Sequence, residues 1–468
     1  MKDITKAANL LSRLDRIPVT RTMISIMILL LLAWVFESFD VGMMGTIIIS
    51  AKHAWNLTED QVGFLGIATT LGVVIGLIPG GRLTDKFGRR TVLLWGTAIY
   101  GLLTFFSAFS PNLETLIVLR VLAGLGEGAI FPIPYLMLSE FVQSNKRGIS
   151  MGWVNGALTG AYAFPLMIGA WATNAFPLEK AWEVMSLFGG IPLLFVIPLL
   201  IWLPESPRFL VKKGRYEELE KIVEKLEKQA NLSQDTSLVN PSILNGLQTT
   251  EMSRGKMGDI FKPPYMIRSV VAYLVFGYSI YVWYVLNVYG PTMFSNQGLG
   301  VNNALTFTAI MMAIAALGTV VHGYLSDKYG RKVTLVVFGA AATICFLLFA
   351  YTQSYNGLII LGILSAFFGL SIVSFGKLYT SEQYPTDIRG LGTATGEMTG
   401  RFFSGVAGLY FIPQLLAWGG NQVVFISMAV FIVLGTIPLI ILGRDTHNIS
   451  VEEAGSSVLS KGKSKLVK

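Results

Sequence analysis

The sequence predicts an all-α membrane protein in which twelve transmembrane helices form two pseudo-symmetric six-helix bundles. Three observations support this fold class. Of the 468 residues, 53% are hydrophobic and only 14% are charged, whereas soluble domains carry about 25% charged residues. Twelve apolar runs reach the length of about 20 residues that a helix needs to cross a bilayer. Two motifs also recur in both halves of the chain at one common spacing.

Each apolar run is interpreted as a helix, because lipid offers the backbone no hydrogen-bond partner and the runs are too long for barrel strands. No small-residue cleavage site follows the first run, which we therefore interpret as a retained span and not as a signal peptide. The twelve predicted spans are approximately 23–49, 61–80, 91–109, 114–138, 148–173, 182–203, 267–290, 303–325, 333–352, 356–378, 391–417 and 420–442.

The composition excludes an ordinary soluble enzyme, a disordered chain and a disulfide-stapled scaffold. Cys345 is the single cysteine, and the three histidines lie too far apart in sequence to show metal-ligand spacing. The sequence has no phosphate-binding or dinucleotide-binding loop. The net charge of +8 comes from basic residues between apolar runs, which is a membrane pattern and not a nucleic-acid-binding one. We predict no catalysis, no cofactor, no bound metal and no nucleic-acid partner.

The distribution of Lys and Arg predicts the orientation, because these residues are enriched in cytoplasmic loops. Of the 36, 32 fall on one side, two lie inside spans, and only Lys52 and Lys180 lie on the other side. Both termini and the central loop are therefore expected in the cytoplasm, in a multi-pass protein of the cell membrane embedded in the lipid bilayer. The predicted segments are an N-terminal tail (1–22), an N-terminal bundle (23–203), a central loop with an amphipathic helix over 215–229 (204–265), a C-terminal bundle (266–442) and a C-terminal tail (443–468).

Two motifs occur twice, each time 242 residues apart, which indicates a duplicated six-helix unit. The first is Gly81-Arg-Leu-Thr-Asp-Lys-Phe-Gly-Arg-Arg90, which recurs as Gly323-Tyr-Leu-Ser-Asp-Lys-Tyr-Gly-Arg-Lys332. The second is Ser139-Glu140 followed by Arg147-Gly148, which recurs as Ser381-Glu382 followed by Arg389-Gly390.

On these motifs the chain resembles the major facilitator superfamily over essentially its whole length. Arg120-x-x-x-Gly124-x-Gly126-x-Gly128 is similar to the family's fourth-helix motif, and Pro204-Glu-Ser-Pro-Arg208 resembles the sugar-porter branch. Two other segments resemble the branch of niacin, aromatic-acid and synaptic-vesicle-like carriers: Tyr384-Pro-Thr-Asp-Ile-Arg-Gly-Leu-Gly392 and Gly400-Arg401. The resemblance implies a secondary transporter that works as a monomer, with its substrate cavity between the two halves.

Charged residues inside spans are candidates for ion coupling, because a charge at a helix centre costs about 2.5–3.5 kcal/mol and usually faces a cavity. Helix 1 carries Glu37 and Asp40, and helix 4 carries Arg120 and Glu127, each pair on one helix face. Asp40 stands where proton-coupled sugar porters carry an aspartate facing the helix 4 arginine. The resemblance therefore implies that Asp40 pairs with Arg120 and takes up a proton when the pair separates. A permanent ion pair joining helices 1 and 4 is the alternative.

A second group of polar and aromatic residues is expected to contact the substrate. Two basic groups in the C-terminal half suit a carboxylate, and aromatic walls suit a planar ring or a sugar face. There are three alternatives. Glu397 could neutralise Arg401 within the same helix, Lys377 could extend to the cytoplasmic face, and the aromatic rings could serve helix packing alone. The candidate residues are Asn155, Tyr281, Trp283, Tyr284, Tyr289, Lys377, Glu397 and Arg401.

The repeated loops are expected to form a cytoplasmic gate, as the family resemblance implies. Gly81 and Gly323 would permit a tight turn at a helix end, and Asp85 and Asp327 would accept hydrogen bonds from helix N-termini or arginines. Positive charge that serves orientation alone is the alternative. The other predicted gate residues are Arg82, Arg89, Arg90, Glu140, Arg147, Arg331, Glu382 and Arg389.

Together these features predict proton symport of a small polar metabolite by alternating access, with a small organic acid anion slightly favoured over a sugar. Protons and the small-molecule substrate are the expected partners. A sugar:proton symporter, a facilitative uniporter, a proton-driven efflux antiporter and a non-transporting receptor or sensor are the alternatives.

Overall fold

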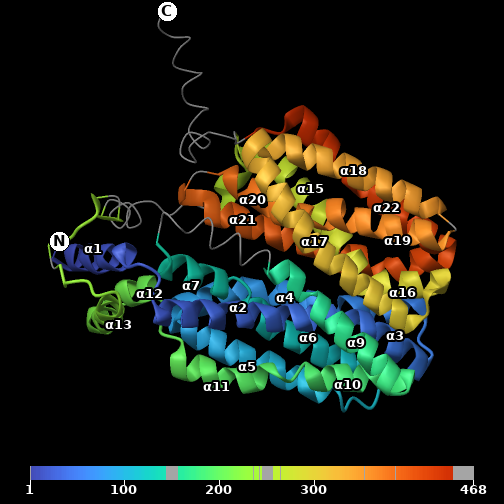
Figure 1. Ribbon diagram of the computed structural model, residues 1–468, viewed down its shortest axis with the longest axis horizontal. Coiled ribbons are helices and arrows are strands. Elements are labelled where there is room, and N and C mark those ends of the chain that lie inside the picture. The colour runs from blue at the N-terminus through green and yellow to red at the C-terminus, as the bar shows by residue number, and fades with distance from the viewer. Residues whose placement is uncertain are drawn as a thin grey trace, which may run out of the picture. The chain divides into compact units, whose positions relative to one another are not determined.

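A computed structural model describes residues 2–143, 157–235, 237–241, 243–244, 257–263, 265–352, 354–384 and 386–445. Every regular element in these ranges is a helix (Figure 1), as the apolar runs predict. The chain forms two compact units, which are described separately. Unit 1 comprises Met1–Ser38, Gly72–Leu158 and Ser186–Arg254, and unit 2 comprises Phe39–Leu71, Thr159–Met185 and Gly255–Lys468. The boundaries of the two predicted bundles stay a prediction.

Unit 1 contains the N-terminal helix and much of the first half of the chain. Its helices are α1 (Lys2–Arg16), α5 (Arg89–Ser107), α6 (Leu113–Ile130), α7 (Ile133–Phe141), α11 (Pro192–Trp202), α12 (Pro207–Lys212) and α13 (Tyr216–Gln229). Three more helices begin in one unit and end in the other: α2 (Arg21–Gly42), α4 (Glu59–Phe87) and α10 (Ala181–Phe188).

A hydrophobic core joins α2, α5, α6, α7 and α11 in unit 1. Leu30, Leu93, Ala123 and Leu199 are among its fully buried side chains. Trp34 extends the contact between α2 and the end of α6, because its indole N–H donates to the carbonyl of Phe131 at 3.2 Å. A buried indole needs such a partner, so this bond sets the rotation of α2 against α6.

Unit 2 contains the whole second half of the described chain and two segments of the first half. Its α-helices are α3 (Met44–Trp55), α9 (Ala163–Ala175), α15 (Tyr265–Tyr284), α16 (Gly290–Phe294), α17 (Val301–Tyr329), α18 (Arg331–Tyr351), α19 (Tyr355–Ser365), α20 (Ile372–Glu382), α21 (Thr386–Gly400) and α22 (Ile412–Leu442). Short 3₁₀ turns occur at η1 (Leu178–Lys180) and η2 (Met257–Phe261), and π-helical segments at η3 (Val285–Tyr289), η4 (Ser295–Leu299), η5 (Ala366–Leu370) and η6 (Arg401–Gly408).

In unit 2, α15 lies against α20, α21 and α22, and α17 lies against α9. Segments 39–71 and 159–185 of the first half belong to this unit through such contacts. Asn302 donates to the carbonyl of Ala170 at 2.6 Å, and Gln414 donates to the Asp60 carboxylate at 2.9 Å. These polar contacts join the middle of α9 and the start of α4 to helices of the second half.

Nine helical stretches among the described residues are long and apolar enough to cross a membrane. The other three predicted spans correspond to α5, to the segment that ends in α9, and to α21 with η6. α5 begins with Arg89 and Arg90, and residues 144–156 before α9 lie outside the described chain. α21 is rich in Gly and Thr. Polar residues in a span reduce its hydropathy without preventing insertion where they face the protein interior.

The N-terminal tail contains a helix that the sequence analysis did not predict. α1 lies beside α13, the amphipathic helix predicted over 215–229 and observed over Tyr216–Gln229 (Figure 1). Leu10 and Leu14 of α1 are buried in a small core together with Leu219 and Val223 of α13. Apolar residues three and four positions apart form one face of a helix, and that spacing was the available signal.

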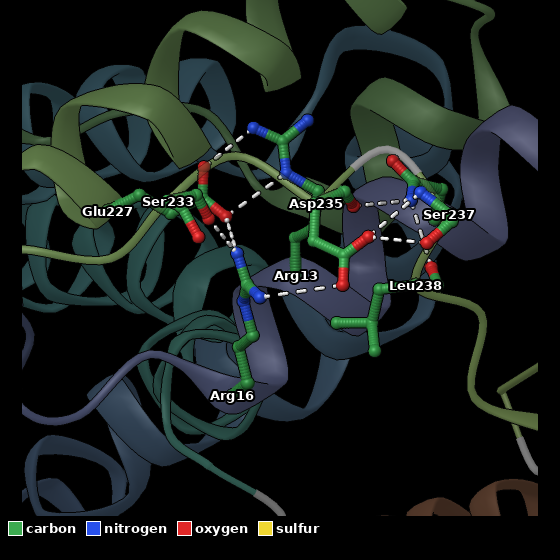
Figure 2. A network of polar contacts seen from close by, with 8 residues as sticks. Arg13, Arg16, Glu227, Ser233, Asp235, Ser237 and Leu238 are labelled. Carbon is green, nitrogen blue, oxygen red and sulfur yellow. Dashed lines mark hydrogen bonds and ion pairs between the residues drawn. The ribbon is translucent and has the colours of Figure 1, made fainter.

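A buried ion pair connects α1 to α13 (Figure 2). Arg13 donates twice to Glu227, at 3.1 and 2.6 Å, and both side chains are 1% exposed. Arg16 donates to the same carboxylate at 2.8 Å and also to the carbonyl of Ser233. We call this group of Arg13, Arg16 and Glu227 the N-terminal clasp.

Glu227 lies outside the membrane-spanning segments, so its titration reports on the clasp. Burial raises the pKa of its carboxyl group, but hydrogen bonds from Arg13 and Arg16 outweigh burial and hold the pKa below its ordinary value. A carboxyl group with a lowered folded-state pKa stabilises the fold above its unfolded-state pKa, and the contribution disappears as the pH falls through the folded-state pKa. The clasp is therefore expected to weaken only below about pH 4.

Removal of one partner of the clasp should detach α1. We expect Glu227→Gln to weaken the docking of α1 by about 3 kcal/mol, because two guanidinium groups then lose their buried counter-charge. The measurement is limited proteolysis of the N-terminal segment. The double variant Arg13→Leu with Glu227→Leu should restore most of the protection, because an apolar pair replaces the two fully buried charges and Arg16, which loses the same partner, is partly exposed. Equal protection of the wild type and Glu227→Gln would contradict this role.

Candidate functional site

Three charged side chains predicted to contact substrate form one cluster in unit 2. The Lys377 ammonium of α20 donates to the Glu397 carboxylate of α21 in an ion pair. Arg401, one turn after Glu397, also attracts this carboxylate. The Glu397 side chain is 12% exposed and that of Lys377 is 37% exposed. We call Lys377, Glu397 and Arg401 the charge cluster.

The contacts of the charge cluster bear on the alternatives that the sequence left open. Glu397 does not serve Arg401 alone, because its direct ion pair is with Lys377 on the neighbouring helix. Lys377 correspondingly points to this carboxylate. Arg401 donates to the hydroxyl of Tyr284 at 3.0 Å, so the cluster also reaches α15.

Arg401 stands at the first position of the π-helical segment η6. Two further π-helical segments, η3 and η5, lie in the predicted helices 7 and 10. Such segments shift the side chains that follow relative to a regular helix and often occur at functional sites. The segments η3, η5 and η6 thus lie in three predicted helices that also carry candidate site residues. These are the aromatic residues near η3, Lys377 after η5 and Arg401 in η6.

Two aromatic rings extend in a row from Tyr284. Trp283 lies edge-on to Tyr284 with ring centroids 4.9 Å apart, and Tyr162 lies edge-on to Trp283 at 4.6 Å. Tyr162 is a ring that the sequence analysis missed, because only the packing of unit 2 brings residues 159–185 next to α15. The three rings form a wall whose end carries the Tyr284 hydroxyl.

The other two predicted aromatic residues have separate partners. The Tyr281 hydroxyl lies 2.9 Å from the Ser427 hydroxyl, and its ring stacks on Phe431 at 4.5 Å. The Tyr289 hydroxyl donates to the carbonyl of Val62 at 3.4 Å. Both rings thus pack between helices. Asn155 lies outside the described residues.

The candidates for proton coupling are all buried. Glu37 and Asp40 lie in α2, and Arg120 and Glu127 lie in α6. Arg120 donates to the Thr104 hydroxyl of α5 at 3.3 Å. Glu37, Arg120 and Glu127 belong to unit 1, whereas Asp40 belongs to unit 2. The pairing of Asp40 with Arg120 stays a prediction.

In unit 1, the first repeated motif forms a compact polar network with the segment after α11. Arg89 pairs with Glu140 of α7 at 2.6 Å, and the Glu140 side chain is only 4% exposed. The Glu205 carboxylate accepts hydrogen bonds at 3.0 Å from the backbone N–H groups of both Arg89 and Arg90. An anion at this position satisfies unpaired donors at the start of α5 and opposes the helix dipole.

Asp85 of the same motif has a weaker contact, an ion pair with Lys212 of α12 at 2.9 Å. The Asp85 side chain is 67% exposed, and exposed pairs contribute about 0–1 kcal/mol. Of the two other predicted gate arginines in this half, Arg82 is exposed in α4 and Arg147 lies outside the described residues.

Unit 2 repeats this arrangement at the second copy of the motif. Arg331 contacts Asp327 at 2.8 Å and Glu382 at 3.4 Å, as Arg89 contacts Glu140. The Asp445 carboxylate lies against the backbone of Gly330, immediately before α18. Arg389 donates to the carbonyl of Tyr384 at 3.4 Å. The contacts described here for the predicted gate residues thus lie within one half of the chain.

The tight turn of each motif is at a different glycine from the one predicted. Gly81 and Gly323 lie inside α4 and α17, so the expectation of a turn there is wrong. The turn occurs at Gly88 and Gly330, which have φ angles of 95° and 97°. A residue with a side chain is strained at such φ values, so these glycines permit the reversal between consecutive helices.

Among the described residues, no group of three His, Cys, Asp or Glu side chains could hold a metal ion. Comparison with known families gives a match to the model of the Major Facilitator Superfamily over residues 29–353 and 305–466. The chain belongs to this superfamily. As a member of this superfamily, it is a membrane transporter and not an enzyme.

Two curated relatives match nearly the full chain. The niacin transporter NiaP of Acinetobacter baylyi is 26% identical over 457 residues, which cover 96% of this chain and 100% of that protein. The 4-hydroxybenzoate transporter PcaK of Pseudomonas putida is also 26% identical over 457 residues, covering 95% of this chain and 98% of that protein.

Solved structures give the same fold. The inward-open structure of the xylose transporter XylE from E. coli has a TM-score of 0.74 and 19% sequence identity, and the match covers 93% of this chain and 99% of that chain. The architecture is thus the all-α membrane fold of the superfamily, in which a single chain moves a small molecule.

Two substitutions distinguish support of the loop from gating. We expect Glu205→Gln to reduce stability by about 1–2 kcal/mol, because the donors at the start of α5 lose their anion. Asp85→Asn should leave stability within about 0.5 kcal/mol, since its pair is exposed, and should impair transport nevertheless. Thermal unfolding and uptake into liposomes measure the two effects. Normal uptake by correctly inserted Asp85→Asn would contradict a gate role for Asp85.

Proposed function

We propose that this transporter carries a small organic acid anion together with protons, by alternating access across the cell membrane. Both termini lie in the cytoplasm in this proposal, as the distribution of Lys and Arg predicts. The observation that carries the proposal is the charge cluster of Lys377, Glu397 and Arg401 beside an aromatic wall.

The charge cluster has the chemistry of a carboxylate site. Arg presents a planar fork of donors that matches a carboxylate, and Lys adds a point charge. Both cationic groups belong to the cluster that reaches the Tyr284 hydroxyl. Trp283 and Tyr162 offer ring surfaces within the same wall. Ligand sites typically combine such apolar surfaces with few, well-placed polar groups.

The names of the relatives support an aromatic acid as the cargo. The two transporters compared above are named for niacin and for 4-hydroxybenzoate, each of which combines a carboxylate with an aromatic ring. The cluster and its wall would place the same two chemical features side by side. At this level of identity, the specific acid is a question for a binding screen.

Proton coupling is assigned to Asp40 and Arg120 in this proposal. Burial favours the neutral form of a carboxyl group, whereas a nearby arginine favours its charged form. A conformational change that moves the two apart would therefore allow Asp40 to bind a proton. Glu37, one turn before Asp40, would add to the cost of a second negative charge on α2.

The contacts within unit 2 support a state that is closed on the side away from the cytoplasm. Segments 39–71 and 159–185 contain Lys52 and Lys180, the two basic residues predicted on the side opposite the cytoplasm. These segments contact the second half through the bonds of Asp60 with Gln414 and of Ala170 with Asn302. Alternating access requires that such contacts break when the site opens to that side.

A sugar is the second candidate cargo. The segment Pro204-Glu-Ser-Pro-Arg208 resembles sugar porters, and Glu205 of this segment binds the start of α5 in the structure. Because Glu205 supports a helix start, the segment indicates a relationship to the sugar-porter branch and does not indicate a particular cargo. The binding screen described next distinguishes the two classes.

Thermal-shift measurements on the purified protein should identify the cargo class. We expect nicotinate or 4-hydroxybenzoate to stabilise the wild type, by about 2.7 kcal/mol at one hundred times the dissociation constant, and xylose or arabinose to have no effect. Arg401→Ala should weaken the binding of the acid about 10- to 100-fold, as expected when a charge-assisted hydrogen bond is lost. The control is Arg401→Lys, which keeps the charge without the fork. Stabilisation by a sugar and by no acid would refute the proposal.

Asp40→Asn tests the proposed coupling. A neutral side chain at this position cannot exchange a proton, so uphill accumulation driven by a pH gradient should be lost while counterflow exchange continues. Both are measured in the same liposomes with the acid found by the screen. The control is Glu179→Gln, which makes the same kind of change at an exposed carboxylate and should leave both processes unchanged. Undiminished accumulation by Asp40→Asn would remove Asp40 from the coupling mechanism.

A further inference from the structure

We propose that α1 controls the first repeated motif from a distance: its docking on α13 holds α12 in place, and α12 in turn holds the turn at Gly88 and the side chain of Asp85. The inference goes beyond the proposed function, because it depends neither on the cargo nor on the coupling ion. It gives the N-terminal helix a role in the predicted gate. All the elements involved belong to unit 1.

The short helix α12 places two consecutive residues in two different contacts. Leu210 is fully buried in the core that also contains Leu14 of α1 and Leu219 of α13. The Phe209 ring lies against the turn of the motif, because a Cβ added at Gly88 would come within 3.0 Å of it. Adjacent residues of a helix share one hydrogen-bonded backbone, so a displacement of Leu210 also displaces Phe209.

Both ends of α12 also bind the polar network around the motif. At the start of the helix, the Ser206 hydroxyl accepts a backbone N–H at 3.1 Å as the N-cap and donates to the Glu140 carboxylate. Glu140 is the ion-pair partner of Arg89. At the end of the helix, Lys212 pairs with Asp85 at 2.9 Å. The position of α12 therefore bears on the motif and its network at three points.

The docked α1 is fixed by polar contacts in addition to its apolar face. Besides the N-terminal clasp, two side chains of α1 bind the segment that follows α13. Asn9 donates to the carbonyls of Asp235 and Leu238 at 3.1 and 2.9 Å, and the Ser12 hydroxyl accepts the N–H of Asn240 at 2.8 Å. These bonds, together with the clasp, fix the rotation of α1. A helix with a fixed rotation presents the same apolar side chains to its neighbours at all times.

Detachment of α1 would remove one wall of the core around Leu210. Burial of apolar surface would then no longer hold α12 against its surroundings. The exposed ion pair of Lys212 with Asp85 cannot replace this support, because such pairs contribute little. The core that joins α2, α5, α6, α7 and α11 is a separate one. We therefore expect the contact between α12 and the motif to loosen while these helices stay packed.

Two spin labels on either side of the contact between α12 and the motif measure this effect. Lys86→Cys and Lys213→Cys carry the labels at exposed positions, in a Cys345→Ala background of the full-length protein in nanodiscs. We expect dipolar broadening of the EPR spectrum, because the labelled positions adjoin the two partners of an ion pair. Glu227→Gln detaches α1 and should abolish the broadening.

Two controls separate this local effect from other changes. Glu220→Gln makes the same chemical change on α13 but breaks only an exposed pair with Lys6, so the broadening should remain. A second label pair, His53→Cys with Lys180→Cys, lies on α3 and η1, which are in contact in unit 2. Its broadening should remain in every variant, whereas general unfolding would abolish it.

A second variant tests the docking of α1 by another route. Leu14→Asn places a polar group in the core between α1 and α13 and should act as Glu227→Gln does. Limited proteolysis shows in each case whether α1 is detached. Broadening that persists between α12 and the motif after α1 has detached would overturn the inference. A helix that stays docked in both variants would overturn it as well, because the clasp and the core would then not be what holds α1.

Discussion

Charged side chains buried among apolar helices are the constraint on which the rest of this structure depends. A charge at a helix centre costs several kcal/mol unless a partner compensates it. The Lys377–Glu397 pair supplies that compensation between α20 and α21. Because each helix carries only part of the cluster, separating α20 from α21 would remove the Lys377 ammonium from the largely buried Glu397 carboxylate. The same requirement that secures helix packing therefore concentrates polar groups at one place, which the proposed function uses as an anion site.

The two halves of the chain apply one solution to a common problem, the reversal of direction between consecutive helices. A glycine with positive φ permits the turn, at Gly88 and again at Gly330. A carboxylate that follows the last helix of each half then lies against this turn, Glu205 in one case and Asp445 in the other. These two carboxylates are 240 residues apart, whereas the repeated motifs are 242 apart. The structural role has thus survived a small change in spacing.

In unit 1, helices outside the membrane-spanning stretches form a connected series from the N-terminus to the first repeated motif. The N-terminal clasp joins α1 to α13, α13 lies against α12, and Lys212 of α12 pairs with Asp85. The first contact contains a buried pair, Arg13 with Glu227, and three hydrogen bonds reach the shared carboxylate, whereas the Lys212–Asp85 pair is exposed. The docking of α1 consequently has the energetics of a core contact, although the sequence places it in a polar tail.

Hydropathy and repetition determined the main features of this protein from sequence alone. Apolar runs predict membrane helices because lipid forces backbone groups to bond within their own segment, and the repeated motifs predict the duplication. The spans, the amphipathic helix near 215–229 and the family follow from such local signals. Tertiary structure decided which distant groups meet: that Glu397 pairs with Lys377, that Tyr162 joins the aromatic wall, that Arg13 finds Glu227, and that the turn falls at Gly88 and not at Gly81. Local patterns carry no information about contacts between residues far apart in sequence, because these arise only when helices pack and buried charges must find partners.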